Sequence, residues 1–377
     1  MTQAPDLPPV TGAWREGDPP GRRRFVTGVQ MLETGPELRF TLAYETWGTL
    51  NSRASNAILV EHALTGDSHA VGPAEEGHVS PGWWDGLIGP GKAIDTDEFF
   101  VVVPNVLGGC QGSTGPSSRH PDGKAWGSRF PAVTVRDQVA AEVVLADALG
   151  IGRWAAVLGG SMGGMRALEW AVSTPDRVEA LLVLASTAQA SADQIAWAAP
   201  QLHAIRADPG WHGGDYHDLP GGGPHVGLGI ARRIAHVTYR SEGELSQRFG
   251  RRYQEEEDPL HGGRFAVESY LDHHAGKLSR RFDAGSYVVL TESMNTHDVG
   301  RGRGGVANAL ARVTARTIAA GVDSDRLYPL YHSRAIADGV AGADFAVIGS
   351  PYGHDSFLIE TEQIARLVKG LVSGNDG

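Results

Sequence analysis

One serine lies between two pairs of glycines in the stretch "LGGSMGGMRALEW", and it is the residue best placed to do chemistry. The residues from Gly159 to Gly163 match G-x-S-x-G, the pattern of a sharp strand-to-helix turn that exposes a serine hydroxyl as a nucleophile. An apolar run precedes this serine and a helical pattern follows it, as that turn requires. Small neighbours are needed because larger side chains would collide across a strained turn. The pattern predicts a nucleophilic Ser161, with an ordinary glycine-rich turn as the alternative.

A serine hydroxyl needs a histidine to take its proton and usually a carboxylate to orient that histidine. Both should follow the serine in chain order and lie just past the ends of strands. The chain has 15 histidines, and His354 in "VIGSPYGHDSF" is the one that meets this condition. Asp323 and Asp325 in "AAGVDSDRLYP" precede it by one strand-helix-strand step. Either aspartate could instead cap a helix, and spacing does not choose between them.

Acyl transfer also needs hydrogen-bond donors for a developing oxyanion. In this kind of site one donor is the backbone N–H after the nucleophile, which here belongs to Met162. The other comes from the loop after an earlier strand, and the stretch "EHALTG" makes Leu64 the candidate. The alternative for Leu64 is a simple exit from a strand.

The elements that must position these residues alternate between strands and helices. The clearest helix runs from a capping box at Thr134 and Asp137 to Gly150, and a hairpin within residues 24–50 predicts an antiparallel sheet edge. This alternation is typical of an α/β fold with a mostly parallel sheet flanked by helices. The predicted buried strands are short apolar runs, and they lie within 56–66, 99–109, 153–160, 177–186, 313–323 and 343–350.

The strand pattern is interrupted over residues 187–303, where helical pieces such as "GLGIARRIAHVTYRS" occur instead. We interpret this stretch as a helical lid domain inserted into a core domain that comprises residues 25–186 and 304–377. Residues 1–24 contain few helix formers and no apolar segment of the kind found in secretory signals. They are predicted to form a peripheral, partly mobile N-terminal arm.

Composition excludes several classes of protein. The chain of 377 residues is 41% hydrophobic, and it contains no apolar run of about 18 residues that could cross a membrane. A formal charge of −11 argues against a general nucleic-acid surface, which needs a basic face. The single cysteine, Cys110, excludes an internal disulfide and a site with several thiolate ligands. A cytoplasmic location is therefore expected.

Two motifs resemble nucleotide sites without meeting their requirements. Residues 86–93 nearly spell a P-loop, but Ala93 follows the lysine and Pro90 lacks an N–H. Residues 300–305 satisfy G-x-G-x-x-G by count, yet no buried strand precedes them. The histidines and acidic residues are too scattered for a metal site. No bound cofactor and no metal are expected.

Taken together, the serine, the late acid and histidine and several connecting stretches resemble the homoserine O-acetyltransferase family of α/β-hydrolase-fold acyltransferases. The resemblance covers nearly the whole chain after the N-terminal arm. The stretches that carry it are "YETWGTLN", "HALTG", "GWWDGLIGPGKAIDT", "NVLGGCQGSTGP", "GGSMGGM", "ARRIAHVTYRS", "RFDAGSY", "GVDSDRLYP" and "GHDSFL". Arg326 and Tyr328 depart from the family, in which Trp or Phe is common there, and we expect no consequence from this difference.

The resemblance implies a role for each residue of the site. It makes Ser161 the nucleophile, His354 the general base and Asp325 rather than Asp323 the orienting acid. It makes Leu64 and Met162 the oxyanion-hole residues. The residues implied to bind the acceptor amino acid are Arg232, Tyr239 and Asp355. A guanidinium suits an α-carboxylate, and a carboxylate suits an α-ammonium. For Arg232 and Tyr239 the alternative is packing of a lid helix against the core.

The implied reaction is transfer of an acetyl group from acetyl-CoA to the γ-hydroxyl of L-homoserine through an acyl-serine intermediate, in methionine biosynthesis. The family also implies a homodimer formed through helices of the insertion. Alternatives that keep the same catalytic residues are a homoserine or serine O-succinyltransferase and a serine esterase. A non-catalytic binding protein on the same fold is the alternative from a different class.

Overall fold

The computed structural model describes residues 8–372 and centres on one eight-stranded sheet. Its strand order is β1-β2-β4-β3-β5-β6-β7-β8. The hairpin of β1 and β2 is antiparallel and lies at the edge, β2 is also antiparallel to β4, and the other neighbouring strands are parallel. The strands are β1 (Arg24–Met31), β2 (Glu37–Trp47), β3 (Ala57–Glu61), β4 (Phe100–Pro104), β5 (Ala156–Gly160), β6 (Ala180–Leu184), β7 (Arg316–Val322) and β8 (Asp344–Ile348). The predicted α/β class, edge hairpin and parallel centre are confirmed.

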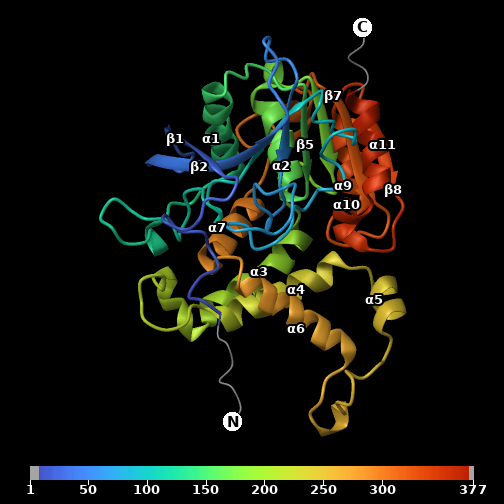
Figure 1. Ribbon diagram of the computed structural model, residues 1–377. Coiled ribbons are helices and arrows are strands. Elements are labelled where there is room, and N and C mark those ends of the chain that lie inside the picture. The colour runs from blue at the N-terminus through green and yellow to red at the C-terminus, as the bar shows by residue number, and fades with distance from the viewer. Residues whose placement is uncertain (1–7, 373–377) are drawn as a thin grey trace.

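Helices cover both faces of this sheet (Figure 1). Four of them pack on one face, namely α1 (Val135–Ala148), α2 (Met162–Ser173), α8 (Val306–Leu310) and α9 (Leu330–Gly339). Two pack on the other face, namely α10 (Ser356–Ile359) and α11 (Thr361–Val372). Helix α1 begins with the predicted capping box between Thr134 and Asp137, and Gly150 follows its C-cap with a positive φ of 74°.

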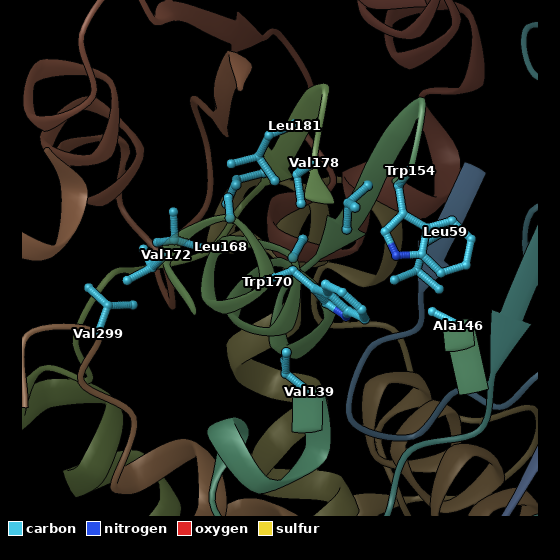
Figure 2. Close-up of a cluster of buried hydrophobic side chains, with 14 of the residues drawn as sticks. Leu59, Val139, Ala146, Trp154, Leu168, Trp170, Val172, Val178, Leu181 and Val299 are labelled. Carbon is cyan, nitrogen blue, oxygen red and sulfur yellow. The ribbon is translucent and has the colours of Figure 1, made fainter. Parts of the chain in front are cut away.

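The larger hydrophobic cluster lies between the sheet and the helices α1 and α2, as Figure 2 shows. Trp154 and Trp170 meet edge to face with ring centroids 6.1 Å apart, a favoured geometry for aromatic pairs. Leu168 on α2 and Leu181 on β6 are fully buried in the same cluster. This packing fixes α2, and with it the turn that holds Ser161, against the centre of the sheet.

Between β6 and β7 the chain forms a second group of helices, which lies beneath the sheet in Figure 1. Helix α4 packs between α3 and α6 through buried Leu228, Ala231 and Ala235. The helices are α3 (Ala192–Ala207), α4 (His225–Tyr239), α5 (Glu242–Phe249), α6 (Ala266–Ser279) and α7 (Ala284–Asn295). Short 3-10 turns occur in the chain at Gly127–Arg129, Pro175–Arg177, Pro209–Gly214, Pro259–His261 and Gly353–Asp355.

The described part of the predicted N-terminal arm lies largely at the surface, and hydrogen bonds near Thr11 attach it to the rest of the molecule. The Thr11 hydroxyl donates to the Asp283 carboxylate at 2.7 Å, and the Trp14 N–H donates to the Cys110 carbonyl at 2.9 Å. Asp283 is fully buried at the start of α7 and needs donors of this kind, which explains why the arm is held there. Residues 1–7 of the predicted arm lie outside the described residues.

Within residues 8–372, no helix is both long enough and apolar enough to cross a membrane.

Candidate active site

Ser161 lies in a tight turn between β5 and α2. Its φ of 56° and ψ of −123° are unusual for a residue with a side chain, and such strain persists only where the surroundings hold it. The Ser161 N–H donates to the Leu184 carbonyl at 2.9 Å, and the Ser186 hydroxyl donates to the Ser161 carbonyl at 2.7 Å. These two hydrogen bonds anchor the turn to the end of β6.

The glycines around Ser161 are required by close backbone packing. A Cβ atom at Gly159 would overlap the Gly163 carbonyl, and a Cβ at Gly163 would overlap the carbonyl of Glu61 at the end of β3. A Cβ at Gly164 would come within 2.6 Å of the Ser186 side chain. The expectation that this turn needs small residues is therefore confirmed.

His354 connects Ser161 to Asp325. The His354 Nε2 lies 2.8 Å from the Ser161 hydroxyl oxygen, and its Nδ1 lies 2.7 Å from the Asp325 carboxylate. In the neutral imidazole, Nδ1–H donates to the carboxylate, which leaves Nε2 free to accept from the serine hydroxyl. All three side chains are buried. This arrangement can remove the serine proton and stabilise the imidazolium that results.

The structure also distinguishes the two candidate aspartates. The second carboxylate oxygen of Asp325 accepts from the N–H groups of Leu327 and Tyr328 at 2.8 and 2.9 Å, which holds the carboxylate toward His354. Asp323 instead accepts from the Ser350 N–H at 3.0 Å and ties together two loops. Of the pair, only Asp325 contacts the histidine.

Leu64 and Met162 lie on the two elements that meet at the Ser161 turn. Met162 is the first residue of α2, so its N–H has no acceptor within the helix. Leu64 lies in the loop directly after β3 and is buried in a cluster that also contains Met162. The structure thus brings the two predicted oxyanion donors into the same region of the molecule.

The residues predicted to bind an acceptor surround His354 on the side of α4. The Tyr239 ring lies 5.7 Å from the His354 ring, and the Arg232 guanidinium lies 5.5 Å from the Tyr239 ring centroid. Within residues 8–372, the buried Nε and Nη1 atoms of Arg232 have no hydrogen-bond partner. Buried N–H groups without acceptors are costly, and a carboxylate would supply the missing acceptors.

Asp355 follows His354 directly, and its carboxylate is opposite in charge to the guanidinium of Arg232 when it is ionised. Its carboxylate lies 3.4 Å from the Arg240 guanidinium. Burial raises the pKa of Asp355 above its usual value, while Arg240 and Arg232 act in the opposite direction. A cationic group such as an ammonium would stabilise the ionised carboxylate further.

Two residues of the site were given no role from the sequence, and one of them, Tyr328, was expected to have no consequence. The Tyr328 ring stacks on the His354 ring with centroids 4.9 Å apart, so this departure from the family touches the predicted base directly. Arg240 pairs with Asp355 from the end of α4. Tyr328 could have been found because it lies three residues after Asp325, but nothing in the sequence marks Arg240 among the many arginines of the insertion.

A cavity of about 50 Å³ lies beside these residues, between the core and the inserted helices. It is bounded by Leu64 and Tyr328 from the core, and by Trp197, Tyr239 and Met294 from α3, α4 and α7. The space next to the predicted oxyanion loop is therefore lined jointly by both parts of the chain.

A buried group of Glu45, His69 and His78 has a composition that could suit a metal ion. However, the two imidazole rings are stacked with an interplanar angle of 13° and centroids 3.9 Å apart, so their nitrogen lone pairs lie in parallel planes rather than converging. His69 contacts the Glu45 carboxylate through one ring nitrogen and the Pro73 carbonyl through the other. Because both contacts are to acceptors, the group fits a buried ion pair better than a metal site.

The doubly wound layers, the mostly parallel sheet and the strained Ser161 turn define an α/β-hydrolase-fold protein. The α/β hydrolase fold family model matches residues 56–361. Homoserine O-acetyltransferases from Thermobifida fusca and Leifsonia xyli subsp. xyli are 68% and 57% identical to the chain. The first match covers 97% of each chain, and the second covers 97% of this chain and 92% of its relative. The chain belongs to the homoserine O-acetyltransferase family, which confirms the resemblance seen in the sequence.

Solved structures of two kinds share this architecture. A homoserine O-acetyltransferase from Bacillus anthracis matches with a TM-score of 0.85 and 28% identity, covering 93% of this chain and 97% of the other. Esterase E22 matches with a TM-score of 0.84 and 28% identity, covering 93% and 99%. The fold alone therefore accommodates both acyl transfer to an acceptor and ester hydrolysis.

Proposed function

We propose that this chain transfers an acetyl group from acetyl-CoA to the γ-hydroxyl of L-homoserine through an acetyl-Ser161 intermediate. The observation that carries the proposal is the hydrogen-bonded series Ser161, His354 and Asp325 beside Arg232, whose buried Nε and Nη1 atoms have no hydrogen-bond partner within residues 8–372. The first part can form an acyl-enzyme, and the second can hold an amino-acid acceptor. The names of relatives that are up to 68% identical support the substrate assignment.

In the donor half-reaction, His354 Nε2 takes the proton of Ser161 as the hydroxyl oxygen attacks the thioester carbonyl of acetyl-CoA. The N–H groups of Leu64 and Met162 would stabilise the oxyanion of the tetrahedral intermediate. When that intermediate collapses, the carbon–sulfur bond breaks and the imidazolium of His354 returns the proton to the CoA thiolate. The acetyl group then remains on Ser161 as an ester.

In the acceptor half-reaction, His354 takes the proton of the homoserine γ-hydroxyl, whose oxygen attacks the acetyl ester. The carbon–oxygen bond to Ser161 breaks, and the serine recovers the proton from His354. Arg232 would bind the α-carboxylate of homoserine, Asp355 would pair with its α-ammonium, and Tyr239 would position both groups beside His354. The product is O-acetylhomoserine, which suits a step in methionine biosynthesis.

The inserted helices serve this reaction by keeping water from the acyl-enzyme. Water competes with homoserine at about 55 M, so the site must favour the acceptor by orientation and by exclusion of solvent. We therefore propose that residues 187–303 form a lid domain over a core domain of residues 25–186 and 304–377. The cavity lined by residues of both parts supports this division.

The same helices support the proposal of a homodimer. Val226 and Ile230 on α4 and Trp197 on α3 expose 71%, 41% and 37% of their surface. Exposed apolar side chains on helices of the insertion are suitable for burial against a second copy. A monomer in light scattering at micromolar concentration would contradict this proposal.

The buried, single Cys110 supports a reducing compartment, and we propose that the protein is located in the cytoplasm.

The competing function is ester hydrolysis, which the similar esterase structures favour. The two can be separated by following CoA release from acetyl-CoA with and without homoserine. We expect homoserine to accelerate steady-state CoA release at least about 100-fold, because transfer then replaces slow hydrolysis of the acyl-enzyme. Equal rates with and without homoserine would favour a hydrolase, and release from succinyl-CoA alone would favour a succinyltransferase.

Replacing Arg232 with methionine tests the acceptor site. Loss of the charged hydrogen bonds to a carboxylate is expected to raise the KM for homoserine by about 10- to 100-fold. Arg233→Met is the matched control, because Arg233 pairs with Asp272 on a partly exposed surface at 2.7 Å. It should change this KM by less than about twofold. Equal effects of the two substitutions on KM would remove Arg232 from the acceptor site.

A further inference from the structure

The peptide group between Ala63 and Leu64 is held by the side chain of His62, which no step of the proposed reaction uses. His62 follows β3 directly and is 1% exposed. Its Nδ1 lies 2.8 Å from the Ala63 carbonyl oxygen, and its Nε2 accepts from the Val106 N–H at 3.0 Å. The imidazole thus bridges the Leu64 loop and the loop after β4.

These contacts define the tautomer of His62. The Val106 N–H is a donor, so Nε2 must present its lone pair, and a neutral imidazole then carries its proton on Nδ1. Burial, together with the Arg166 guanidinium, holds the pKa of His62 well below its usual value, so the ring is neutral at physiological pH. Nδ1–H therefore donates to the Ala63 carbonyl.

This hydrogen bond also orients the Leu64 N–H. The Ala63 C=O and the Leu64 N–H belong to one planar peptide group, and the described chain contains no cis peptide bond. In a trans peptide these two bonds point in opposite directions, so fixing the carbonyl also fixes the N–H. The Gly66 N–H donates to the same carbonyl at 2.8 Å and assists in holding it.

We propose that His62 is a positioning residue of the oxyanion hole, which aims the Leu64 N–H by fixing the carbonyl of the same peptide group. This inference rests on the proposed function, in which the Leu64 N–H stabilises the oxyanion. His62 does not touch the substrate and exchanges no proton with it, because both of its ring nitrogens are occupied.

The backbone of His62 is itself tied to the helix that carries the other donor. Arg166 on α2 donates through Nη2 to the His62 carbonyl at 2.8 Å. Its Nη1 lies 2.7 Å from the carboxylates of both Glu61 and Glu142, and all three side chains are buried. Because Met162 begins the same helix, this network holds the two predicted oxyanion donors in a fixed relation.

Two substitutions separate the positioning role from a structural one. In His62→Asn, the side-chain amide NH₂ can take the place of Nδ1–H and keep the hydrogen bond to Ala63, while the contact with Val106 is lost. In His62→Gln, the longer side chain can present its carbonyl oxygen to the Val106 N–H but cannot reach back to Ala63. A positioning role therefore predicts that Asn preserves catalysis better than Gln.

The measured quantity is the rate of acetylation of Ser161 by acetyl-CoA, resolved into kcat and KM. Loss of one oxyanion donor costs about 100- to 1,000-fold in kcat, and a misdirected donor should approach the lower value. We expect kcat to fall about 30- to 100-fold in His62→Gln and less than about tenfold in His62→Asn, with KM changed less than about threefold in both. Midpoints of thermal unfolding for the two variants report the structural contribution separately.

The opposite order of the two kcat values, or losses that follow the unfolding midpoints, would overturn the positioning role. If neither variant folds, the ¹⁵N chemical shifts of His62 in the wild-type protein show which ring nitrogen carries the proton. A proton on Nδ1 supports the proposal, and a proton on Nε2 overturns it. A wild-type protein that forms no acetyl adduct on Ser161 would overturn the proposed function and this inference together. An adduct combined with the wrong order of variants overturns the inference alone.

Discussion

Replacing Ser161 with alanine is expected to lower the rate of acetyl transfer to homoserine by about a million-fold, the scale seen when a triad nucleophile is removed. The hydroxyl is the only group of Ser161 that contacts His354, at 2.8 Å, so its removal deletes the atom that would carry the acetyl group. The backbone at this turn already holds a side chain with a φ of 56°, and alanine introduces no additional atoms. The free energy of unfolding should therefore change by less than about 1 kcal/mol. Steady-state transfer kinetics and denaturant unfolding measure the two quantities.

Ser186→Ala is the control for this substitution. Ser186 is also buried, and its hydroxyl donates to the Ser161 carbonyl, which also accepts from the Met165 N–H. Its loss removes one hydrogen bond of the turn but no reacting atom, so transfer should fall less than about tenfold. Transfer in Ser161→Ala within about 100-fold of wild type would show that another residue carries the acyl group.

Replacing Asp325 with asparagine is expected to lower kcat by about 10,000-fold, as for the equivalent change in a serine protease triad. The amide nitrogen of asparagine would face His354 Nδ1 as a donor, which favours the tautomer with the proton on Nε2. That tautomer cannot accept the proton of Ser161. The carboxylate oxygen that accepts from the Leu327 and Tyr328 N–H groups has a counterpart in asparagine, so the loop should keep its conformation. Single-turnover acetylation of Ser161 measures the effect directly.

Asp323→Asn is the matched control, two residues away on the same loop. Asp323 accepts from the Ser350 N–H, and asparagine retains an oxygen for that hydrogen bond. We expect less than about a threefold change in kcat. Comparable losses in the two variants would mean that the loop, and not the contact between Asp325 and His354, limits the reaction.

Much of the fold could be predicted because its signals are local. The apolar runs at residues 56–66 and 153–160 contain β3 and β5, which are buried on both faces as such runs require. The capping box at Thr134 specified the start of α1 from four residues alone. The attachment of the N-terminal arm at Thr11 could not be predicted, because it depends on Asp283, a residue far away in the sequence that is buried and requires hydrogen-bond donors.

The candidate site could be predicted where chain order and strand ends constrain it. Ser161 and His354 follow strands of a parallel sheet, so topology brings them to the same edge. The choice of Asp325 over Asp323 required the family resemblance, because the two differ only in which way the loop directs each carboxylate. The contact of His62 with Ala63 carries no sequence signal, since a histidine beside a strand is equally compatible with exposure to solvent. The orientation of the ring depends on the Val106 N–H, which donates to Nε2 from a loop distant in the sequence.

In the proposed reaction, Ser161 accepts an acetyl group and passes it to homoserine. The most direct test is the intact mass of the protein after brief exposure to acetyl-CoA, followed by peptide mapping of the adduct and then by addition of homoserine. We expect one added acetyl group on Ser161 and its loss on addition of homoserine, with O-acetylhomoserine as the product. An unmodified Ser161, or an acetyl group on Ser161 that homoserine does not discharge, would contradict the proposed reaction.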